Sequence, residues 1–379
     1  MKGTAPLRRV ARRAAWDLAL LLTCAAVFVP YAVRRHTPSG LWFGDNPYYM
    51  LTTESLVKDG DLDLRNQLGE DPNRMRDSIG LGARGEWYST HPLLMPVCAV
   101  PFYVFLGRDG FLAFNVAAVL ALVWVLFRTV RTAAKPWAAF TAVVLFTFTT
   151  QTMGAVYNFS PDAFSTLVTL AGVYLLLRER PLAGGIFFGL AVLARTPNVI
   201  LLPAAVPFLL MGRRPWRSLL YFFAGAAPSG AVFLLMNAHM YGGPFTLSYS
   251  RVLMLTEKGV VMQDNRGLFG ARYLLSGLWG QLADRHHGLF FTNTLALAGL
   301  LGLPALFRRS RRTALLVLLP ALFLYVFHAF FKLWYVSGEG SNRYLFTAVL
   351  LMAVPFALLL EAVEGRAAPP EPVGGGRAS

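Results

Sequence analysis

Long apolar runs, separated by short polar segments, follow one another along most of the chain. A membrane-spanning helix needs roughly 20 predominantly apolar residues. These runs predict an all-α polytopic membrane protein with about ten transmembrane helices. The predicted spans are residues 16–33, 111–127, 137–153, 162–177, 182–194, 199–211, 219–236, 288–307, 314–331 and 344–363.

The apolar segment at residues 91–106 is an exception. It is shorter than a typical span and contains Pro92, Pro96 and Pro101. Irregular backbone at membrane depth is tolerated only where protein or a water-filled cavity surrounds it. We therefore expect an interfacial or re-entrant segment that does not cross the membrane.

Basic residues lie in short clusters between the apolar runs, and their placement gives the predicted orientation. Positive residues mark the cytoplasmic side of a membrane protein. If residues 91–106 do not cross, every such cluster falls on the side of the basic N-terminus. Both termini are then cytoplasmic, whereas residues 34–91 and 237–287 form external loops. The clusters occupy residues 128–135, 178–180, 213–217 and 308–312.

The composition agrees with a membrane protein and excludes other classes. Of the 379 residues, 55% are hydrophobic and 15% are charged, against about 25% charged residues in a soluble domain. The net charge of +15 does not indicate nucleic-acid binding, because the basic clusters follow the positive-inside pattern. The first apolar run lacks a signal-peptide cleavage site, so we expect an uncleaved span. Residues 1–363 form one transmembrane domain, and residues 364–379 a disordered tail.

Acidic residues are concentrated in the first external loop, which holds nine of the chain's 20. Pro47 is favoured just inside a helix start, which makes Asn46 the expected N-cap. Asp45 is then not needed as a cap, and we select it as the candidate catalytic residue. Downstream, apolar residues share one face and Glu54 pairs with Lys58 at i, i+4. This pattern predicts a short amphipathic helix in the membrane interface.

Two further charged residues have two interpretations each. Asp162 either caps the helix that follows it or assists Asp45, and capping is the favoured interpretation. Arg195 lies between two apolar runs, where a charge is costly. It either serves a site or extends to the membrane surface.

The acidic run from Asp59 to Glu70 has carboxylates at positions 1, 3, 5 and 12 of an EF-hand loop. Leu64 replaces the glycine that such a loop needs at position 6. An exposed turn is therefore expected, and no metal or other cofactor is predicted. Cys24 and Cys98 lie in apolar runs and form no disulfide framework or zinc-binding spacing.

The last external loop begins with Lys332 and ends with Arg343 and Tyr344. Cations at the outer membrane edge oppose the positive-inside trend. A bound anion, such as a lipid phosphate, would explain Arg343. The alternative is contact with lipid headgroups. Arg285, at the outer end of another span, has the same two interpretations, and headgroup contact is favoured there.

Several short motifs follow one another along the chain. They are Gly44-Asp45-Asn46-Pro47-Tyr48-Tyr49, Asp59-Gly60-Asp61-Leu62-Asp63-Leu64-x-Asn66, His91-Pro92, Ser160-Pro161-Asp162, Tyr241-Gly242-x-Pro244-Phe245, Arg285 to Leu289, and Gly340-x-x-Arg343-Tyr344. Their order and spacing, over residues 10–363, resemble the GT-C superfamily of integral membrane glycosyltransferases. This superfamily includes the protein O-mannosyltransferases and the bacterial lipid A aminoarabinose transferases.

The resemblance implies a helical bundle that transfers a sugar from a polyprenyl-phosphate donor. The acceptor would be a glycan, lipid or protein at the external face of a bacterial cytoplasmic membrane. By resemblance, Asp45 is the catalytic acid of the first external loop, which takes the acceptor's proton while Arg343 stabilises the departing phosphate. Many relatives have a second acid directly after this Asp, where this chain has Asn46. We assign Asp45 and Asp162 to catalysis, and Tyr49, His91, Arg195, Arg285, Lys332, Arg343 and Tyr344 to substrate binding.

Two other classes stay open. A transporter would need ionisable residues along a path through the membrane, and only Arg195 qualifies. The sequence also lacks the internal repeat of many transporters. A non-catalytic scaffold of the same fold is motivated by Asn46. A transporter would move its solute without forming a glycosylated product, and a scaffold would tolerate Asp45→Ala.

Overall fold

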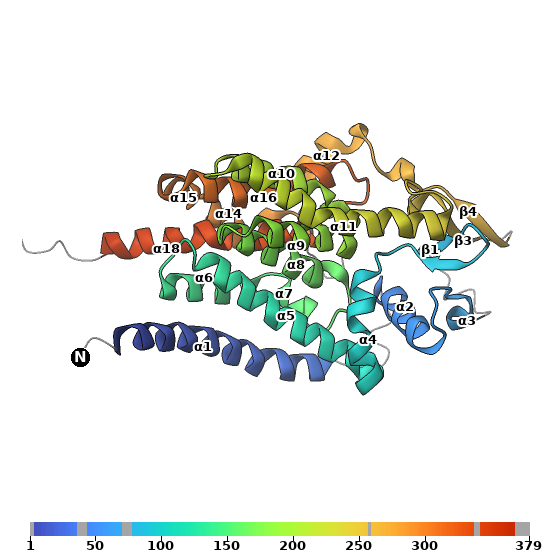
Figure 1. Ribbon diagram of the computed structural model, residues 1–379, viewed down its shortest axis with the longest axis horizontal. Helices are drawn as coiled ribbons and strands as arrows, with labels where there is room; N and C mark the ends of the chain where they lie inside the picture. The colour runs from blue at the N-terminus through green and yellow to red at the C-terminus, as the bar shows by residue number, and fades with distance from the viewer. Residues whose placement is uncertain (1–3, 36–43, 70–77, 257–258, 337–341, 368–379) are drawn as a thin grey trace, which may run out of the picture.

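The computed structural model of the protein describes residues 4–35, 44–69, 78–256, 259–336 and 342–367. It is an elongated helical bundle whose longer helices lie roughly along its long axis (Figure 1). The start of α1 (Thr4–Arg35) and the end of α18 (Ala353–Ala367) lie at the same end of the bundle. The predicted helical architecture is therefore confirmed.

The predicted apolar runs coincide with helices, some of them broken. Five runs each form one helix: α5 (Asp109–Val130), α8 (Pro161–Leu177), α9 (Pro181–Ala194), α11 (Pro215–Tyr241) and α16 (Arg311–Ala329). The run at residues 137–153 forms α6 (Pro136–Thr149) and the start of α7 (Thr152–Ala155). The other runs past α1 form short consecutive helices: η2 (Thr196–Ile200) with α10 (Leu201–Leu210); α13 (Leu289–Thr292), α14 (Thr294–Leu300) and α15 (Leu303–Arg309); and η7 (Arg343–Leu345), α17 (Phe346–Leu351) and α18.

Five helical segments are long and apolar enough to cross a membrane by themselves. Five further apolar helical segments have 10–17 residues, which is shorter than the roughly 20 residues of a typical span. Helix length therefore does not establish the predicted total, which stays a prediction. The five segments are Ala14–Arg35, Asp109–Val130, Pro215–Tyr241, Arg311–Ala329 and Arg343–Gly365.

Helix α4 (Leu94–Leu106) contains the segment that was predicted not to cross. It lies across one end of the bundle, where α1 arrives and from which α5 departs (Figure 1). Because α1 runs toward this end and α5 runs away from it, the residues between them, including α4, fit a loop that stays at this end. We call this end, with α2, α4 and the strands, the external end, after the side that the sequence analysis predicts for it.

Ion pairs at the opposite end join the basic clusters to acidic partners. Lys135 Nζ lies 3.3 Å from Glu364 Oε2, and Arg312 pairs with Glu179. Arg309 Nη1 lies 3.6 Å from Glu361 Oε2. These contacts bring clusters from separate loops to one end, as the orientation argument requires.

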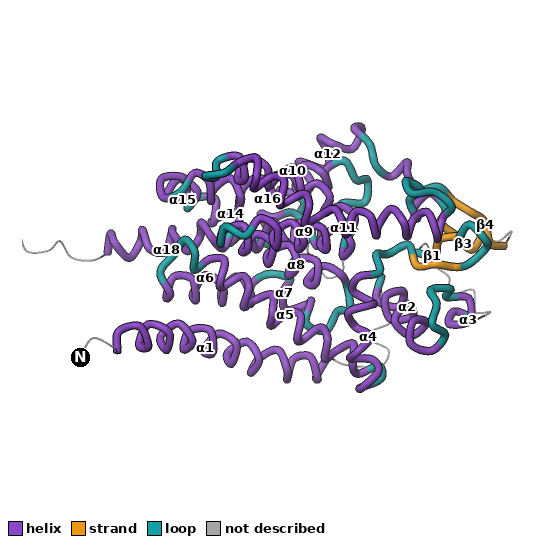
Figure 2. The backbone as a smooth tube through the Cα atoms, viewed as in Figure 1, coloured by secondary structure: helices purple, strands orange, loops and turns teal. Residues whose placement is uncertain are grey.

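The external end carries a four-stranded antiparallel sheet that the sequence analysis did not predict (Figure 2). Strands of three to five residues are too short for their alternation to be recognised in the sequence. The order β2-β1-β3-β4 places a strand of the first external loop beside a strand of the second, which ties the two loops together. The strands are β1 (Ile79–Leu81), β2 (Trp87–Ser89), β3 (Val252–Thr256) and β4 (Gly259–Gln263).

Helix α2 (Asn46–Lys58) lies where the sequence predicted a short helix in the first loop, but it is buried along most of its length rather than on one face. The predicted pair of Glu54 and Lys58 is confirmed, with 3.6 Å between the charged atoms. One side of the helix packs on α4, and another side packs on a cluster that includes Leu64 and Ile79. Glu54 also accepts a hydrogen bond of 2.8 Å from Arg108 Nε. Protein contacts therefore fix the position of α2, which begins directly after Asp45.

Glycines let three helices of the bundle approach closely. A Cβ atom at Gly185 of α9 would collide with the backbone of Phe222 in α11, and one at Gly172 of α8 would collide with the Phe188 ring of α9. Small residues allow such approaches between membrane helices. The packing holds α9 between α8 and α11, and Arg195 follows α9 directly.

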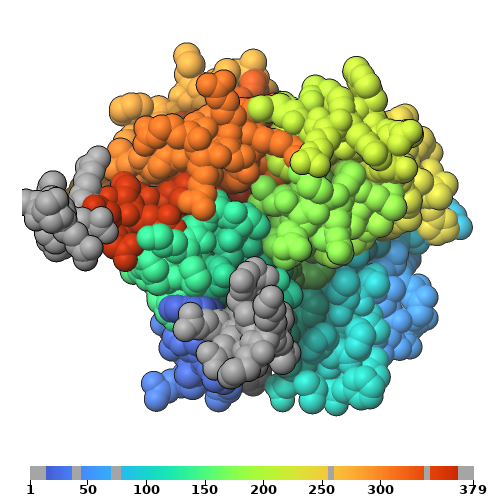
Figure 3. All heavy atoms as spheres, turned by 60° about the vertical axis from the view of Figure 1, so that its left-hand side comes forward, coloured from blue at the N-terminus to red at the C-terminus, as the bar shows by residue number. Residues whose placement is uncertain are grey.

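The C-terminal span lies at the centre of the bundle. Of an apolar stretch of 18 residues in this span, 72% is buried inside the protein, against 22% for the corresponding stretch in α1. Figure 3 shows α18 packed between α6 and the segment of α14 and α15. The chain enters this central span at Arg343, which places that residue beside the external ends of several helices.

Candidate active site

Asp45 lies at the external end with its carboxylate turned toward two basic side chains. Arg343 Nη1 is 2.7 Å from Asp45 Oδ2, and His91 Nε2 is 3.9 Å from Asp45 Oδ1. The helix begins at Asn46, so Asp45 rather than Asn46 occupies the N-cap position, one residue earlier than predicted. Its side chain makes no capping hydrogen bond. The carboxylate therefore remains free for Arg343, as the selection of Asp45 assumed.

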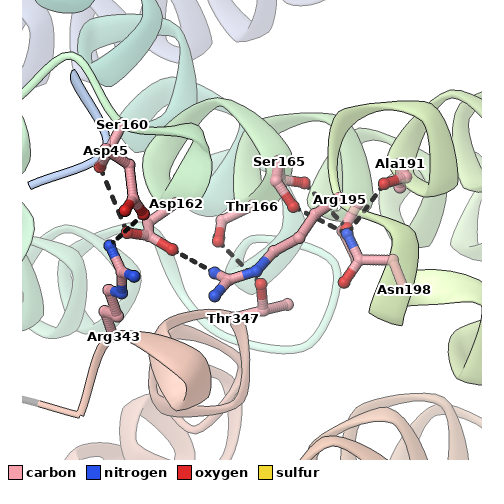
Figure 4. Close-up of polar contacts among 11 residues, drawn as sticks. Asp45, Ser160, Asp162, Ser165, Thr166, Ala191, Arg195, Asn198, Arg343 and Thr347 are labelled. Carbon is pink, nitrogen blue, oxygen red and sulfur yellow. Dashed lines mark hydrogen bonds and ion pairs between the residues drawn. The ribbon is translucent and has the colours of Figure 1, made fainter. Parts of the chain in front are cut away.

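Asp162 and Arg195 form a second ion pair close to the first (Figure 4). The capping role favoured for Asp162 is wrong, because Ser160 occupies the N-cap position and the Asp162 carboxylate pairs with Arg195. Ser160 Oγ also donates to Asp162 Oδ2 over 3.2 Å. Extension of Arg195 to the membrane surface is likewise excluded, because its side chain is only 15% exposed.

Tyr344 lies beside both guanidinium groups. Its ring centroid is 4.9 Å from the Cζ atom of Arg195 and 5.3 Å from that of Arg343. The ring of His328 in α16 stacks on Tyr344 at 5.1 Å and fixes its orientation. Cations next to an aromatic face gain about 0.5–2 kcal/mol, depending on their exposure. Tyr344 thus helps to hold the two arginines side by side.

His91 is held by aromatic rings of α2. Its ring stacks on Tyr49 with centroids 4.9 Å apart and an interplanar angle of 19°, and the Tyr48 centroid lies 5.8 Å away. These contacts keep the imidazole next to Asp45. The predicted residues Tyr49 and His91 are therefore parts of the same cluster as Asp45.

Burial and the charges of the cluster act on the pKa of Asp45 in opposite directions. Burial raises the pKa of the Asp45 carboxyl, but the charges of His91 and Arg343 lower that pKa by more, so the net shift is downward. Arg195 adds a smaller downward shift. The carboxylate is therefore held in its ionised form. Burial followed by the negative charge of Asp45 raises the pKa of the Tyr49 hydroxyl, which stays protonated.

Buried hydrogen bonds fix the helices that carry the second pair. Asn198 Nδ2 donates to Ser165 Oγ over 2.7 Å and to the Ala191 carbonyl over 3.0 Å, and so joins the end of α9 to α8 (Figure 4). The hydroxyls of Thr166 and Thr347 lie 2.7 Å apart and join α8 to α17. Since α17 follows Arg343, this network holds both ion pairs in one arrangement.

Two residues assigned to substrate binding stand apart from the cluster. In the part of the chain that the structure describes, neither Arg285 nor Lys332 forms an ion pair, and Arg285 is exposed. Their proposed roles stay predictions. The carboxylates of Asp61 and Asp63 accept hydrogen bonds from nearby groups of their own loop. Within the described ranges, no group of three or more His, Cys, Asp or Glu residues could hold a metal ion.

The sequence analysis missed a groove next to the cluster. It has a volume of about 260 Å³, and His91 is among its lining residues. Apolar side chains of α4 and α11 supply much of the lining, including Val97, Phe233 and Met240, and Thr196 beside Arg195 also contributes. A groove between helices far apart in the sequence has no local signal. The charged cluster thus adjoins a mostly apolar groove.

The sequence analysis also missed Tyr249, which lies in η3 (Ser248–Ser250) of the second external loop. Burial, and then the charge of Asp45, raise the pKa of its hydroxyl to about 12. No motif marked this residue. A lone tyrosine in a polar loop has no sequence feature that distinguishes it from other exposed tyrosines.

Residues 91–238 match the family model described as dolichyl-phosphate-mannose-protein mannosyltransferase. No curated protein matches the chain. Among solved structures, the chain is similar to the oligosaccharyltransferase of Archaeoglobus fulgidus in its apo form, with a TM-score of 0.58 and 17% identity. It is also similar to ArnT from Cupriavidus metallidurans bound to undecaprenyl phosphate, with a TM-score of 0.60 and 14% identity.

These similarities extend over nearly the whole chain but only part of each relative. The matches cover 93% of this chain, 52% of the oligosaccharyltransferase and 61% of ArnT. The chain thus spans about half to three-fifths of the length of these structures. At such low identity the likeness concerns the fold. The chain is therefore a multi-pass membrane protein with the fold of the GT-C glycosyltransferases, and its residues 91–238 match the mannosyltransferase family model.

Proposed function

We propose that the protein is a glycosyltransferase that moves a sugar from a polyprenyl-phosphate donor to an acceptor hydroxyl at the external face of the membrane. The observation that carries this proposal is the cluster of two carboxylates and two guanidinium groups at one end of a membrane bundle. Perturbed, paired charges in such a position are typical of functional sites. The similar ArnT structure is bound to undecaprenyl phosphate, which is a lipid phosphate.

Arg343 and Arg195 suit the donor phosphate. A guanidinium group binds phosphate oxygens through paired, charge-assisted hydrogen bonds. As the sugar leaves, the bond between its anomeric carbon and the phosphate oxygen breaks, and negative charge grows on the phosphate. Cations held in advance at that position lower the free energy of the transition state. The lipid phosphate is then the leaving group.

Asp45 suits the acceptor. The acceptor oxygen forms the new bond to the anomeric carbon and gives up its proton, which the Asp45 carboxylate accepts. Arg343 holds Asp45 in a less basic state, because it lowers the pKa of the carboxyl. A donor phosphate that binds Arg343 competes with Asp45 for the guanidinium. Asp45 then becomes a stronger base when a donor is present.

The groove beside His91 suits the apolar chain of the donor. Its lining is mostly apolar, and it begins near the charged cluster. A prenyl chain buried there would gain about 25 cal/mol per Å² of apolar surface removed from water. The phosphate would then lie at the mouth of the groove, within reach of the basic side chains.

The test is sugar transfer by purified protein with polyprenyl-phosphate sugars and a mixture of envelope acceptors. Asp45→Asn nearly preserves shape but cannot accept a proton, so transfer should fall by about 10²-fold or more. Asp17→Asn is the matched control, because Asp17 also pairs with an arginine, Arg128, at 3.3 Å. Near-normal transfer by Asp45→Asn would remove the catalytic assignment. A scaffold would show no transfer in the wild type and would retain its cellular role in Asp45→Asn.

A further inference from the structure

Helix α12 (Leu274–Ala283) is attached to the external end of α16. The backbone N–H of Gly270 donates to the carbonyl of Phe330 over 2.9 Å, and the Lys332 N–H donates to the carbonyl of Leu268 over 2.7 Å. Figure 1 shows α12 at the edge of the bundle. Since these bonds join the residues just before α12 to the residues just after α16, they place the start of α12 at the level where α16 ends.

The side of α12 that faces α16 is small and polar. A Cβ atom at Gly277 would collide with the backbone of Ala329 in α16, and Gly280 is buried as well. Gln281 is fully buried, and its Nε2 atom donates to the carbonyl of Tyr325 over 3.0 Å. The inward side of α12 therefore provides close backbone contact and a hydrogen bond, and it buries no large apolar side chain.

The outward side of α12 carries large apolar side chains instead. Leu275 is 80% exposed, and Trp279, one helical turn later, is 71% exposed. A helix at the surface of a soluble protein has the opposite arrangement, with its apolar stripe toward the core. The reversed arrangement in α12 indicates that its outer side lies against an apolar medium rather than against water.

The helices that contact α12 have exposed apolar side chains too. Phe290 and Phe291 are exposed on α13, which follows α12 directly, and Leu322 is exposed on α16. Helix α16 is long and apolar enough to cross a membrane by itself. Lipid tails are as apolar as these side chains. The outward side of α12 therefore adjoins helices whose exposed side chains lie in lipid.

Arginines on both sides of α12 indicate how deep the helix lies. Arg272 precedes the helix and Arg285 follows it, and both are exposed. Such side chains are costly in the hydrocarbon core and extend to the phosphates at its surface. Tryptophan is enriched at the same level of a membrane. Together, these residue types indicate the membrane interface rather than the hydrocarbon core.

We propose that α12 is a membrane-anchoring helix that lies in the interface of the bilayer at the external end, with Leu275 and Trp279 inserted among the lipids. The partner is the lipid surface itself, whose phosphates lie at the level of Arg272 and Arg285. Part of the predicted external loop at residues 237–287 is thus in the membrane rather than in water. This inference depends on the membrane class of the chain and not on the proposed sugar transfer.

The experiment measures the depth of α12 in a bilayer. Single cysteines replace Leu275 or Trp279 in a full-length variant that lacks Cys24 and Cys98. Each cysteine is labelled with a bimane fluorophore, and the protein is placed in phosphatidylcholine nanodiscs. The lipids carry a quenching nitroxide either near the headgroup or near the end of the acyl chain. Thermal unfolding checks that each variant is folded.

Two further labelled variants calibrate the depth. Met262→Cys is the matched control, because Met262 is an apolar residue of the same loop that is 57% exposed. It lies in β4, which Figure 1 shows at the tip of the external end. Leu322→Cys, in the middle of α16, is the reference for the hydrocarbon core.

We expect the nitroxide near the headgroup to quench Leu275→Cys and Trp279→Cys at least about threefold more than Met262→Cys, because an interfacial helix inserts its apolar face about 5–10 Å into the bilayer surface. The nitroxide near the chain end should quench these two labels less than the shallow nitroxide does. It should quench Leu322→Cys most strongly.

Two results would overturn the proposal. Quenching of Leu275→Cys and Trp279→Cys that is no stronger than that of Met262→Cys would assign the outward side of α12 to water or to another protein. Stronger quenching of these labels by the deep nitroxide than by the shallow one would place α12 in the hydrocarbon core. Both results would leave the proposed sugar transfer untouched, because no residue of α12 belongs to the charged cluster.

Discussion

Ion pairs occur at both ends of the bundle, and those of the charged cluster are more buried than the pair of Lys135 and Glu364 at the other end. At the external end, the side chains of Arg195 and Asp162 are 15% and 8% exposed. At the other end, Lys135 and Glu364 are 60% and 52% exposed. The same kinds of residue are therefore paired in surroundings where their energies differ greatly.

This difference in burial distinguishes the candidate active site from charged residues that only reflect the orientation of the chain in the membrane. An exposed pair contributes about 0–1 kcal/mol to stability. Burying a pair costs desolvation free energy that the attraction between the charges often does not recover. The external cluster is therefore poorly explained by stability, whereas the exposed pairs need no explanation beyond the positive-inside pattern.

The largest expected effect compares two arginines at opposite ends. Arg343→Gln removes a preorganised cation from the proposed leaving group, so transfer should fall by about 10²–10³-fold. The Arg309 side chain is 56% exposed and pairs with Glu361. The variant Arg309→Gln should therefore transfer the sugar at the wild-type rate. Initial rates of both purified variants test this contrast. Equal rates would mean that the external cluster has no special role.

A smaller effect is expected from removal of the second buried carboxylate. Asp162→Asn leaves the guanidinium of Arg195 largely buried without its partner, which should cost about 3 kcal/mol of stability. Transfer should also fall, by about tenfold, because Arg195 loses its fixed position. Thermal unfolding in detergent and initial rates measure the two effects. An unchanged unfolding temperature would show that the pair carries little free energy.

The pH dependence of Arg343→Gln isolates the electrostatic part of the comparison. Burial raises the pKa of Asp45, and His91 and Arg343 lower it by more. Without Arg343 a lowering cause is lost while burial remains, so the pKa of Asp45 should rise. A base must be ionised to act, so the acidic limb of kcat/KM should move to higher pH. A shift to lower pH would contradict this electrostatic account.

The smallest effect is expected at the end opposite the charged cluster. Glu364→Gln removes one partner of the exposed pair with Lys135 and should change the free energy of unfolding by no more than about 0.5 kcal/mol. Transfer should stay at the wild-type level. Equilibrium or thermal unfolding and initial rates provide the measurement. A loss comparable to that of Asp162→Asn would erase the distinction between the two ends.

Part of the site could be predicted because its signals are local. The position of Pro47 indicated the start of the helix, although Asp45 and not Asn46 occupies the N-cap position, and the Asp45 side chain makes no capping bond. A cation at an outer membrane edge singled out Arg343. For Asp162 the local pattern was misleading, since Ser160-Pro161-Asp162 also fits a helix start. Its partner Arg195 lies on another helix, so the sequence contains no signal for the pair.

The sequence by itself determined the membrane class, the apolar helices, the basic clusters and the GT-C resemblance. These properties depend on hydration and charge along the chain, so local composition suffices to recognise them. Only the tertiary structure decided that Asp45 meets Arg343, that Asp162 meets Arg195, and that a sheet joins the two predicted external loops. Such contacts join segments far apart in the sequence, and they depend on how helices pack rather than on which residues form helices.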